Sequence, residues 1–478
     1  MGVTGMTADS RAVRPGMLYA ALPGTRADGR AFISDAVARG AAAVLAPVGT
    51  AWPVGVPVRP MILDAEPRRA LARLAAMQAG PQPERIVAVT GTNGKTSTAE
   101  FLRQILAGSG VEAASLGTLG LITRTSQGCT LGAQRVPAEL RVLLRNPGLT
   151  TPDPVELAET LAALARDGAQ AVALEASSHG LDQFRLDGVR LAAAGFSNLT
   201  RDHLDYHGTM EAYRAAKLRL FDALLPAGAP AVASASLDAA TMDALRGIAA
   251  RRGLALHRVG EDGDLLRLLR ATPQPGGQVL EIDAGGVRRE VVLALPGRFQ
   301  ADNALLAAGL AIVTGTADAL DRLPALRGVR GRMELAATLP NGAAVYVDYA
   351  HTPDALDRLL SALRPHTAGR LHVVFGAGGD RDPGKRPLMG VAARAADRAI
   401  VTDDNPRSED PAAIRRAILA ALPGAVEIGD RAAAIAAAMD GLAPGDVLVV
   451  AGKGHEQGQA VGGTVLPFDD ASIVRGLL

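Results

Sequence analysis

Residues 86–108 read Ile86-Val-Ala-Val-Thr-Gly-Thr-Asn-Gly-Lys-Thr-Ser-Thr-Ala-Glu-Phe-Leu-Arg-Gln-Ile-Leu-Ala-Gly108. The β-branched run from Ile86 to Val89 predicts a buried strand, and the apolar spacing from Ala99 to Leu106 predicts a helix. Between them, Gly91 and Gly94 let backbone amides close on an anion at a helix N-terminus. The stretch therefore predicts a phosphate-binding loop in an α/β domain.

Two side chains of this loop fit a nucleotide. Lys95 can reach the β- and γ-phosphates, and the Thr96 hydroxyl can ligate Mg²⁺. The loop departs from the long phosphate-loop pattern, because Val89 stands where the first glycine is expected and Gly91 lies inside the loop instead. A bare Gly-Lys-Thr would be weak support, but the flanking strand and helix favour a nucleotide site over an ordinary turn.

The composition is that of a soluble globular protein. A chain of 478 residues with 48% hydrophobic content predicts about three domains with substantial cores. The 50 lysines and arginines nearly cancel 49 acidic residues, which argues against bulk binding to nucleic acid or an anionic membrane. The single cysteine, Cys129, excludes an intrachain disulfide and fits a reducing cytosol. With neither a signal-peptide pattern nor an apolar run long enough to span a bilayer, we expect a cytoplasmic protein.

The chain divides into three expected α/β units, at residues 1–83, 84–328 and 329–478. The first ends in a proline-containing linker, and composition alone favours ordinary surface loops over ligand contacts for its polar segments at 9–11 and 25–29. We expect a central unit with a mostly parallel sheet and the phosphate loop, followed by a Rossmann-like C-terminal unit.

In the central unit, two polar loops follow expected neighbouring strands. The strand at 171–174 leads into Glu175, and the strand at 191–196 leads into a segment that contains His203 and His207. Because ligands bind at the carboxyl edge of such sheets, Glu175 and His203 are candidates for a metal–nucleotide site. A lone histidine in a loop is more often a surface or capping residue, and His207 is interpreted in that way.

Two expected helices of the central unit carry further polar residues. The helix at 210–220 presents Tyr213 and Lys217 one turn apart, a spacing that by itself favours a solvated face. The stretch 295–308 is expected to open a helix capped by Asp302 or Asn303.

In the C-terminal unit, three expected strands end in loops that bear glycines and charges. The strands at 371–375, 399–402 and 446–450 lead into 376–382, 403–407 and 451–456, respectively. A small charged ligand is therefore expected at this edge. The glycines at 376–379 are similar to part of a dinucleotide fingerprint, but no helix with its third glycine follows. A nicotinamide-dependent oxidoreductase is thus a remote alternative.

Seven longer motifs follow one another along the chain: Thr90-Gly-Thr-Asn-Gly-Lys-Thr-Ser97, Glu175-Ala-Ser-Ser-His-Gly-Leu181, Asn198-Leu-Thr-Arg-Asp-His-Leu-Asp-Tyr-His-Gly208, Asp348-Tyr-Ala-His-Thr-Pro-Asp354, Gly378-Gly-Asp-Arg-Asp-Pro-Gly-Lys-Arg-Pro-Leu-Met389, Asp404-Asn-Pro-Arg407 and Gly452-Lys-Gly-His-Glu456. In this order they resemble the Mur ligase family, ATP-dependent amino-acid-adding enzymes of peptidoglycan precursor synthesis. The set is most similar to the MurE type, the UDP-N-acetylmuramoyl-tripeptide synthetases.

The resemblance implies acyl-phosphate chemistry. The D-glutamyl carboxylate of UDP-MurNAc-L-Ala-D-Glu would attack the γ-phosphorus of ATP, and the amine of an incoming amino acid would capture the acyl phosphate. The products are an amide, ADP and phosphate, and the cofactor implied is Mg²⁺. The implied partners are three small-molecule substrates: ATP, the UDP-MurNAc-dipeptide and meso-diaminopimelate. We expect no nucleic-acid partner and no membrane span, and we expect the protein to be a monomer.

The resemblance also implies roles around the nucleotide. Thr96 and Glu175 would serve one Mg²⁺, while His203 and a carboxylated Lys217 would serve a second. A carbamate would convert the Lys217 cation into an anionic oxygen ligand. With Lys95, the residues Glu175, His203 and Lys217 form the implied catalytic set. The implied ATP-binding residues are Gly91, Thr92, Asn93, Gly94, Lys95, Thr96, Ser97, Asn303, Arg332 and Asp348.

Two further substrate sites are implied. The UDP substrate would contact Ser10, Thr25, Arg26, Ala27, Asp28, Thr150, Thr151, Ser177, Gln183 and Arg185. The incoming amino acid would contact Arg381, Asp404, Asn405, Pro406, Arg407, Gly452 and Glu456. The planar fork of Arg407 suits a carboxylate, so it favours meso-diaminopimelate, whose far end is zwitterionic, over lysine, whose far end is a bare cation.

Two departures from the family pattern qualify the resemblance. The chain begins only a few residues before Asp9, so an opening segment usual in the family is short or absent, which affects the expected uracil pocket. The stretch 120–149 is longer than expected and carries Arg124, Arg135, Arg141 and Arg145. It is either a tolerated surface insertion or a basic lid over the pyrophosphate of the UDP substrate.

The alternatives to a diaminopimelate-adding enzyme are an L-lysine-adding ligase, a folylpolyglutamate synthase and a non-catalytic scaffold with the same fold. The double threonine at 150–151 and the Asp-Asn-Pro-Arg motif argue against a folylpolyglutamate synthase. The presence of Lys95, Thr96, Glu175, His203 and Lys217 argues against the scaffold.

Overall fold

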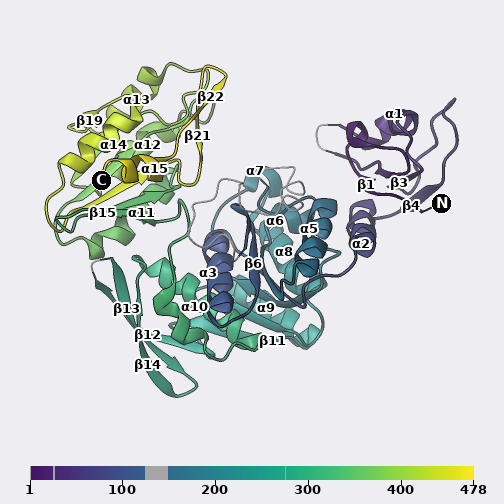
Figure 1. The fold of residues 1–478 in the computed structure, drawn as a ribbon, viewed down its shortest axis with the longest axis horizontal. Helices are drawn as coiled ribbons and strands as arrows, with labels where there is room; N and C mark the ends of the chain where they lie inside the picture. Colours follow the sequence, from purple (N-terminus) through teal and green to yellow (C-terminus); the bar gives the residue numbers. More distant parts are fainter. Residues whose placement is uncertain (1, 25–26, 124–148, 275) are drawn as a thin grey trace. The chain divides into compact units, whose positions relative to one another are not determined.

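The computed structural model describes residues 2–24, 27–123, 149–274 and 276–478 (Figure 1). Thr25, Arg26 and the arginines of the stretch 124–148 therefore lie outside the described residues. The chain forms two compact units, one of residues 1–265 and 306–319 and the other of 266–305 and 320–478, and each is described by itself. Among the helices in the described part of the chain, none is both long enough and apolar enough to cross a lipid bilayer.

The N-terminal part of the first unit is a small sheet with helices. Four parallel strands lie in the order β1-β2-β3-β4, drawn in purple in Figure 1. Apolar strand residues such as Tyr19 and Val44 pack against Ile33 and Val37 of the first helix. The elements are β1 (Met6–Thr7), β2 (Leu18–Ala20), α1 (Ile33–Ala38), β3 (Ala43–Pro47), β4 (Met61–Asp64) and α2 (Pro67–Ala79).

The larger sheet of the first unit carries the phosphate loop. Its strands lie in the order β11-β10-β9-β5-β8-β6-β7, parallel except for β7. They are β5 (Arg85–Thr90), β6 (Ala113–Gly117), β7 (Gly120–Ile122), β8 (Ala171–Glu175), β9 (Leu191–Phe196), β10 (Pro230–Ser234) and β11 (Ala255–Gly260). The sequence-based expectation that β8 and β9 are neighbours is wrong, because β5 lies between them. The phosphate loop is therefore flanked on both sides by the polar loops.

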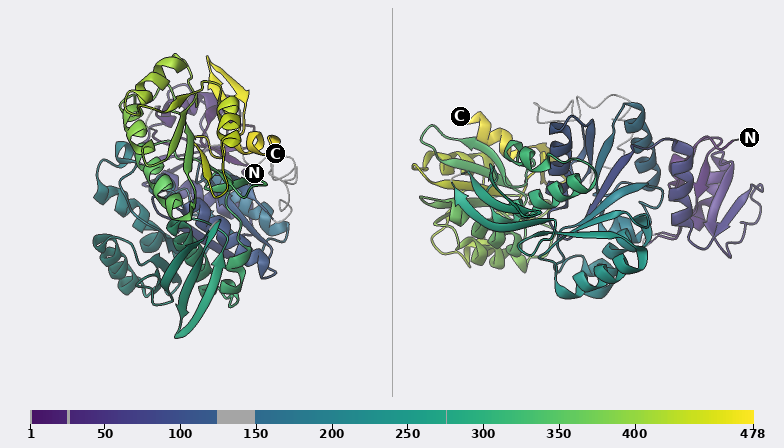
Figure 2. Two further views of the ribbon diagram at one scale, coloured as in Figure 1. Left: turned by 90° about the vertical axis from the view of Figure 1, so that its left-hand side faces the viewer. Right: turned by 90° about the horizontal axis from the view of Figure 1, so that it is seen from below.

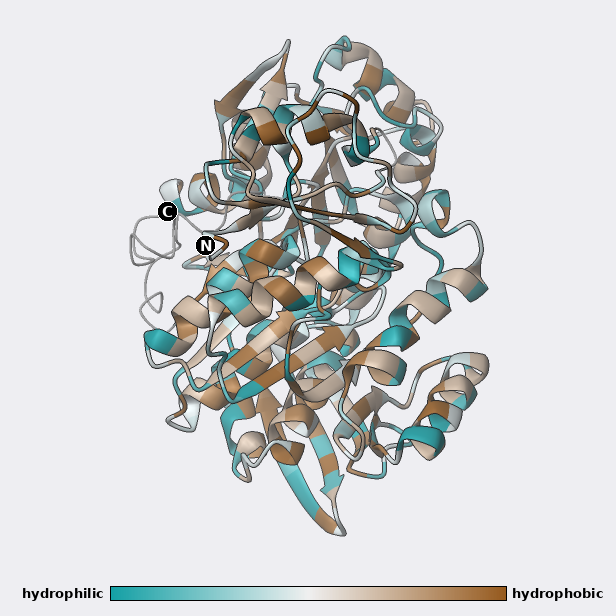
Figure 3. Cartoon of the chain, turned by 90° about the vertical axis from the view of Figure 1, so that its right-hand side faces the viewer, coloured by the Kyte–Doolittle hydropathy of each residue, from teal (hydrophilic) through white to brown (hydrophobic). Residues whose placement is uncertain are grey.

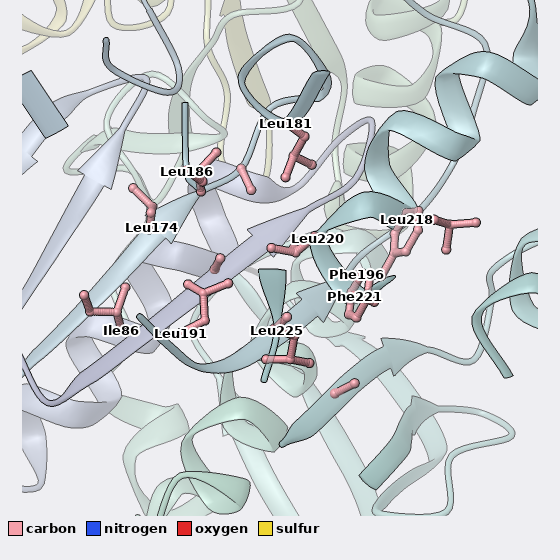
Figure 4. Packing of buried hydrophobic residues seen from close by; sticks show 14 of the residues in the cluster. Ile86, Leu174, Leu181, Leu186, Leu191, Phe196, Leu218, Leu220, Phe221 and Leu225 are labelled. Atoms are coloured by element: carbon pink, nitrogen blue, oxygen red, sulfur yellow. The ribbon is translucent and has the colours of Figure 1, made fainter. Parts of the chain in front are cut away.

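Helices cover this sheet. The expected helix at 99–106 is confirmed within α3 (Lys95–Gly108), and α5 (Pro154–Arg166) is a further helix of this unit. Ile86 belongs to one hydrophobic cluster with Leu157 and Leu161 of α5, and the rings of Phe196 and Phe221 stack 5.9 Å apart in it (Figure 4). The remaining helices are α6 (Ser178–Asp182), α7 (Leu204–His207), α8 (Met210–Arg219) and α9 (Ala239–Arg252).

The second unit contains an antiparallel ribbon and a six-stranded sheet. The ribbon pairs β12 (Leu266–Gln274), β13 (Gly277–Ala284) and β14 (Val287–Leu293), which Figure 2 shows from two directions. The six strands lie in the order β15-β16-β20-β17-β18-β19, parallel apart from β15. Their bounds are β15 (Glu334–Thr338), β16 (Ala344–Asp348), β17 (Leu371–Phe375), β18 (Arg398–Val401), β19 (Val426–Glu427) and β20 (Val447–Ala451).

Both faces of the six-stranded sheet are buried. Val373 packs in one cluster with α11, α12 and α13, whereas its neighbour Val374 packs in another with α14 and α15. Hydrophobic residues accordingly follow the strands in the hydropathy view (Figure 3). The helices are α11 (Pro353–Leu363), α12 (Lys385–Ala393), α13 (Pro411–Leu419), α14 (Arg431–Asp440) and α15 (Asp470–Gly476), and a hairpin pairs β21 (Gly458–Val461) with β22 (Thr464–Pro467).

One expected helix start is wrong. Helix α10 (Arg298–Val313) begins four residues before Asp302, so neither Asp302 nor Asn303 caps it. Asp302 instead forms an ion pair with Arg298 at 3.2 Å, one turn earlier in the same helix. The helix therefore begins directly after the Pro296-Gly297 break, which is the stronger signal.

Candidate functional site

The phosphate loop is held by the loop that follows β9. Ser197 Oγ donates to the Asn93 carbonyl at 2.6 Å, and Asn93 N donates to the Asn198 side chain at 2.9 Å. Gly91 has φ 149°, and a β-carbon there would collide with the Ser197 hydroxyl. Any other residue at Gly91 would push these two loops apart.

Two lysines converge on the carbonyl of Gly91. Lys95 Nζ donates to it at 2.9 Å and Lys217 Nζ at 2.7 Å. Lys217 is 1% exposed, so burial lowers its pKa well below the ordinary value, and the charge of Lys95 lowers that pKa further. The pair is an electropositive centre at the loop in which one amine is driven toward its neutral form.

The expectation of a solvated face for Tyr213 and Lys217 is wrong. Both side chains are 1% exposed, the ring of Tyr213 lies 4.5 Å from Lys217 Nζ, and its hydroxyl donates to Thr92 Oγ1 at 3.2 Å. Spacing within α8 places the two side chains on one face of the helix. It does not predict whether that face is buried against the rest of the protein or exposed to solvent.

Glu175 lies at the end of β8 with both carboxylate oxygens held. Thr96 Oγ1 donates to Oε2 at 3.0 Å, and the backbone amide of Thr118 donates to Oε1 at 2.8 Å. Sequence reasoning missed Thr118, although its position directly after β6 could have placed it at the same sheet edge. The arrangement joins a carboxylate and a threonine hydroxyl beside the start of α3.

Histidine and tyrosine rings gather beside this centre. His203 lies 4.8 Å from His179 between ring centroids, and His207 lies 5.5 Å from His179 and 5.2 Å from Tyr213. Burial lowers the pKa of His179 and of His207, and the neighbouring histidines lower the pKa of His179 further. His207 is half-buried in the last turn of α7, and its Nε2 atom has no hydrogen-bond partner among the described residues, so its interpretation as a surface or capping residue stays a prediction.

The residues expected around the UDP substrate in the central sheet form one hydrogen-bonded cluster. Thr151 Oγ1 lies 3.0 Å from Ser177 Oγ, and Arg185 donates both to the Thr151 carbonyl and to Gln183, each at 2.7 Å. Thr150 Oγ1 lies 3.1 Å from Thr118 Oγ1, which connects the cluster to Glu175.

In the N-terminal sheet, the two expected ligand loops both approach Tyr19. Asp9 caps the turn that contains Ser10, and Asp28, next to Ala27, caps the following turn. Burial raises the pKa of Tyr19 to about 12, and the charges of Asp9 and Asp28 contribute. The Tyr19 hydroxyl also donates to the carbonyl of Gly29, next to Asp28, at 2.8 Å.

In the second unit, Asp348 lies at the end of β16. Its carboxylate accepts from the amides of Met333 at 2.7 Å and Ala350 at 2.8 Å, yet burial raises its pKa. The Arg332 guanidinium stacks 4.6 Å from the ring of Tyr349, and its buried Nε atom has no hydrogen-bond partner in the part of the chain that the structure describes. Asn303 is buried beside Gln300, with 3.4 Å between their amides.

The residues expected to bind the amino acid come together on three loops of the six-stranded sheet. Asn405 Nδ2 donates to Glu456 Oε2 at 2.9 Å, and Arg407 donates to the Gly379 carbonyl at 2.7 Å. Pro406 is buried, and Gly452 lies against Asp404. Arg381 is exposed on the glycine loop after β17.

Three family models match successive segments of the chain. They are the Mur ligase family catalytic domain at residues 2–78, the Mur ligase middle domain at 89–311 and the Mur ligase glutamate ligase domain at 331–454. The three domains expected from the sequence are therefore present, although the boundaries proposed after residues 83 and 328 stay predictions.

The chain is also similar to individual proteins over its full length. It is 57% identical to the UDP-N-acetylmuramoyl-L-alanyl-D-glutamate–2,6-diaminopimelate ligase of Caulobacter vibrioides, with 98% of this chain and 94% of the relative covered. It is 52% identical to the enzyme of that name from Mesorhizobium japonicum, with 100% and 95% covered. A solved structure of a ligase of the same name matches with a TM-score of 0.72 and 34% identity, over 99% of this chain and 94% of that one.

A more distant structure, MurF of Thermotoga maritima in complex with ADP, shares the fold at 19% identity and a TM-score of 0.61, over 99% of this chain and 97% of that one. The family models and the full-length relatives agree with the motifs along the sequence. The chain belongs to the Mur ligase family.

Proposed function

We propose that this chain is the MurE-type ligase that joins meso-diaminopimelate to UDP-N-acetylmuramoyl-L-alanyl-D-glutamate at the expense of ATP. The observation that carries the proposal is the full-length similarity, 57% over 473 residues, to a 2,6-diaminopimelate ligase. The reaction belongs to peptidoglycan precursor synthesis, and we place it in the cytoplasm, with the protein acting as a monomer.

The phosphate loop supports ATP as the phosphoryl donor. Residues 91–97 offer backbone amides at the start of α3, and Lys95 already points back along the loop to the Gly91 and Thr92 carbonyls. The loop would hold the phosphates while the D-glutamyl carboxylate attacks the γ-phosphorus and ADP leaves. The amine of the diamino acid then attacks the acyl carbon, phosphate leaves, and the amide forms.

The oxygen donors beside the loop fit one magnesium ion. Thr96 and Glu175 are hard ligands, and magnesium in nucleotide sites usually takes one or two protein oxygens together with phosphate oxygens. When bound, the ion would neutralise negative charge on the β- and γ-phosphates. The described residues contain no group of three or more His, Cys, Asp or Glu side chains arranged for a metal. A second ion at His203 would therefore depend on a further anionic ligand.

A carbamate on Lys217 would be that ligand. Its formation requires a neutral amine, which attacks the carbon of CO₂ and releases a proton to solvent. Burial and the nearby Lys95 both lower the pKa of Lys217, which shifts the side chain toward the neutral amine. The buried position also supports an anionic group next to the Lys95 cation.

The amino-acid loops support diaminopimelate over lysine. Arg407 has φ 51°, and two hydrogen bonds tie its backbone to the β21–β22 hairpin: Arg407 N donates to the Ala460 carbonyl at 2.9 Å, and Gly462 N donates to the Arg407 carbonyl at 2.7 Å. Among residues 2–24, 27–123, 149–274 and 276–478, only the Gly379 carbonyl accepts a hydrogen bond from the Arg407 guanidinium, through Nη1. The remaining donors suit the far carboxylate of diaminopimelate, which lysine lacks.

Amide formation with meso-diaminopimelate and with L-lysine tests the proposal. We expect kcat/KM to be about 10- to 150-fold higher for diaminopimelate, because a hydrogen bond between a carboxylate and the half-buried Arg407 is worth roughly 1.5–3 kcal/mol. Preference for lysine would reject the assigned substrate. Absence of ATP hydrolysis with both substrates present would indicate a scaffold without catalysis.

A further inference from the structure

Lysine is rare in this chain and confined to a few places. Of the 50 basic residues only four are lysine, namely Lys95, Lys217, Lys385 and Lys453, and the others are arginine. Lys95 and Lys217 already belong to the phosphate loop and its neighbour. In a chain that uses arginine at nearly every cationic position, a buried lysine indicates a place where a compact ammonium is needed.

Lys453 is one of these buried lysines, and its side chain is 0% exposed. Its Nζ donates to Asn405 Oδ1 and to the Gly458 carbonyl, both at 2.8 Å. It also lies 3.8 Å from a carboxylate oxygen of Asp404 and 3.8 Å from one of Glu456. A single ammonium therefore contacts three of the residues expected to receive the incoming amino acid.

The contacts around Lys453 fix the direction of the Asn405 amide. Because Lys453 Nζ and Ala460 N both donate to Oδ1, at 2.8 and 2.9 Å, the Nδ2 group must point the other way, where it donates to Glu456. The orientation of the Glu456 carboxylate follows from that bond. Gly452, at φ 119°, lies so close to Asp404 that a β-carbon there would be 2.5 Å from the Asp404 Oδ2 atom.

We propose that Lys453 is a positioning residue for the amino-acid site: it locks Asn405 and Glu456 in place and balances the charge of Asp404 and Glu456. This inference rests on the proposed function. Lys453 does not touch the reacting atoms. It sets the geometry and the net charge that the zwitterionic end of the diamino acid meets.

Arginine would not serve at this position. The Lys453 ammonium donates to two acceptors that approach it from different loops, whereas a guanidinium is planar and wider. With no exposed surface around the side chain, the extra atoms would have to displace one of the loops. This explains why lysine is kept here in an arginine-rich chain.

The replacement Lys453→Met tests the proposal, because it keeps the length of the side chain and removes the ammonium. We expect the KM for meso-diaminopimelate to rise about 10- to 100-fold, the range expected when a buried polar group loses its partner. The KM values for ATP and for the UDP substrate should stay within about twofold, since these ligands use other loops. Lys453→Gln keeps one donor and should give an intermediate KM; it also replaces Lys453→Met if that variant does not fold.

A double-mutant cycle with Asn405→Ala identifies the route of the effect. If Lys453 acts through Asn405, the double variant should have a KM for diaminopimelate close to that of the worse single variant. His372→Leu is the matched control, because it breaks another buried pair, with Asp446 at 3.1 Å, at the opposite end of β17. We expect it to lower the melting temperature without changing the KM for diaminopimelate.

Three results would overturn the inference while leaving the ligase function intact. One is an unchanged KM for diaminopimelate in folded Lys453→Met or Lys453→Gln. Another is an equal rise in the KM of all three substrates, which would mean a general structural defect. The third is strict additivity with Asn405→Ala. Failure of the wild-type protein to form an amide with diaminopimelate would instead reject the proposed function.

Discussion

At the scale of single residues, Lys217 is the side chain whose environment differs most from its sequence-based interpretation. Helical spacing suggested a solvated lysine, whereas the structure buries it against Gly91 and Tyr213. Resemblance to Mur ligases pointed to the residue, but only tertiary packing reveals the lowered pKa that favours carboxylation. A pattern within one helix cannot report which neighbouring element covers it.

We predict that Lys217 carries a carbamate in the active protein. In buffer with ¹³C-labelled bicarbonate, NMR should show a carbamate carbon that Lys217→Arg lacks and that the control Lys385→Arg keeps. Lys217→Arg should lower kcat by at least about 100-fold, because an always-charged side chain cannot become an anionic ligand. Full activity of Lys217→Arg would contradict the prediction.

His455 gives a prediction on pH. Burial, together with Arg332 and Arg330, lowers its pKa from 6.5 to about 4. The folded state therefore binds fewer protons than the unfolded state between these values, so stability is lost as the pH falls through this window. From pH 7 to 5 the contribution of His455 to the free energy of unfolding should fall by up to about 2 kcal/mol. Urea unfolding at pH 7 and pH 5 measures the change in the free energy of unfolding. In His455→Gln the decrease between the two pH values should be smaller by the contribution of His455. An equal drop in both proteins would show that His455 titrates normally.

At the scale of elements, strand and helix positions were largely predictable because they rest on local patterns. The strands β9 and β17 and the helix α3 agree with the sequence-based expectation. The start of α10 was predicted wrongly. Asp302 and Asn303 are good capping residues in isolation, but they lie after a stronger helix-start signal at Pro296-Gly297. Hydrogen bonds between distant loops, such as Thr118 with Glu175, leave no local pattern and could not be predicted.

Helix α15 is attached to α14 by a buried ion pair. Arg431 Nε and Nη2 donate to the two oxygens of Asp470 at 2.7 Å each, with both side chains 0% exposed, and Nη2 also donates to the Ala451 carbonyl next to Gly452. Asp470→Asn leaves the arginine buried without its counter-charge. We expect a loss of about 3–5 kcal/mol in the free energy of unfolding, measured by urea denaturation.

The matched control for this pair is exposed. Arg358 and Asp354 form an ion pair of 3.1 Å on α11, with side chains 52% and 75% exposed. Asp354→Asn should change the free energy of unfolding by less than about 1 kcal/mol, because solvent screens the pair. The double variant Arg431→Met, Asp470→Leu should be more stable than Asp470→Asn alone, since no charge then remains buried. Equal losses in Asp470→Asn and Asp354→Asn would contradict the importance of burial.

At the scale of the whole molecule, the sequence located the catalytic parts on separate domains, and the structure gives each compact unit its own core. Leu161 belongs to the cluster around the phosphate-loop sheet, and Leu360 belongs to the cluster under the amino-acid loops; both are 0% exposed. The phosphate loop and the Asp404–Arg407 loop are thus supported by different cores. Sequence motifs could assign each loop to a domain. They could not predict how the stability of the protein is divided between the two compact units.

Separate cores predict two unfolding transitions in scanning calorimetry. Leu161→Ala should lower the midpoint of the first unit's transition only, and Leu360→Ala that of the second unit's only. In each variant the free energy of unfolding of the affected unit should fall by about 2–5 kcal/mol, because apolar burial is lost and a cavity remains. A non-hydrolysable ATP analogue should raise the midpoint of the first transition, because the phosphate loop lies in the first unit and a bound ligand stabilises the unit that holds it. Since the two leucine variants are matched in residue type and burial, they serve as controls for each other. A single transition that shifts with both variants would mean that the two units unfold as one cooperative body, and that substrate binding on either unit stabilises the whole enzyme.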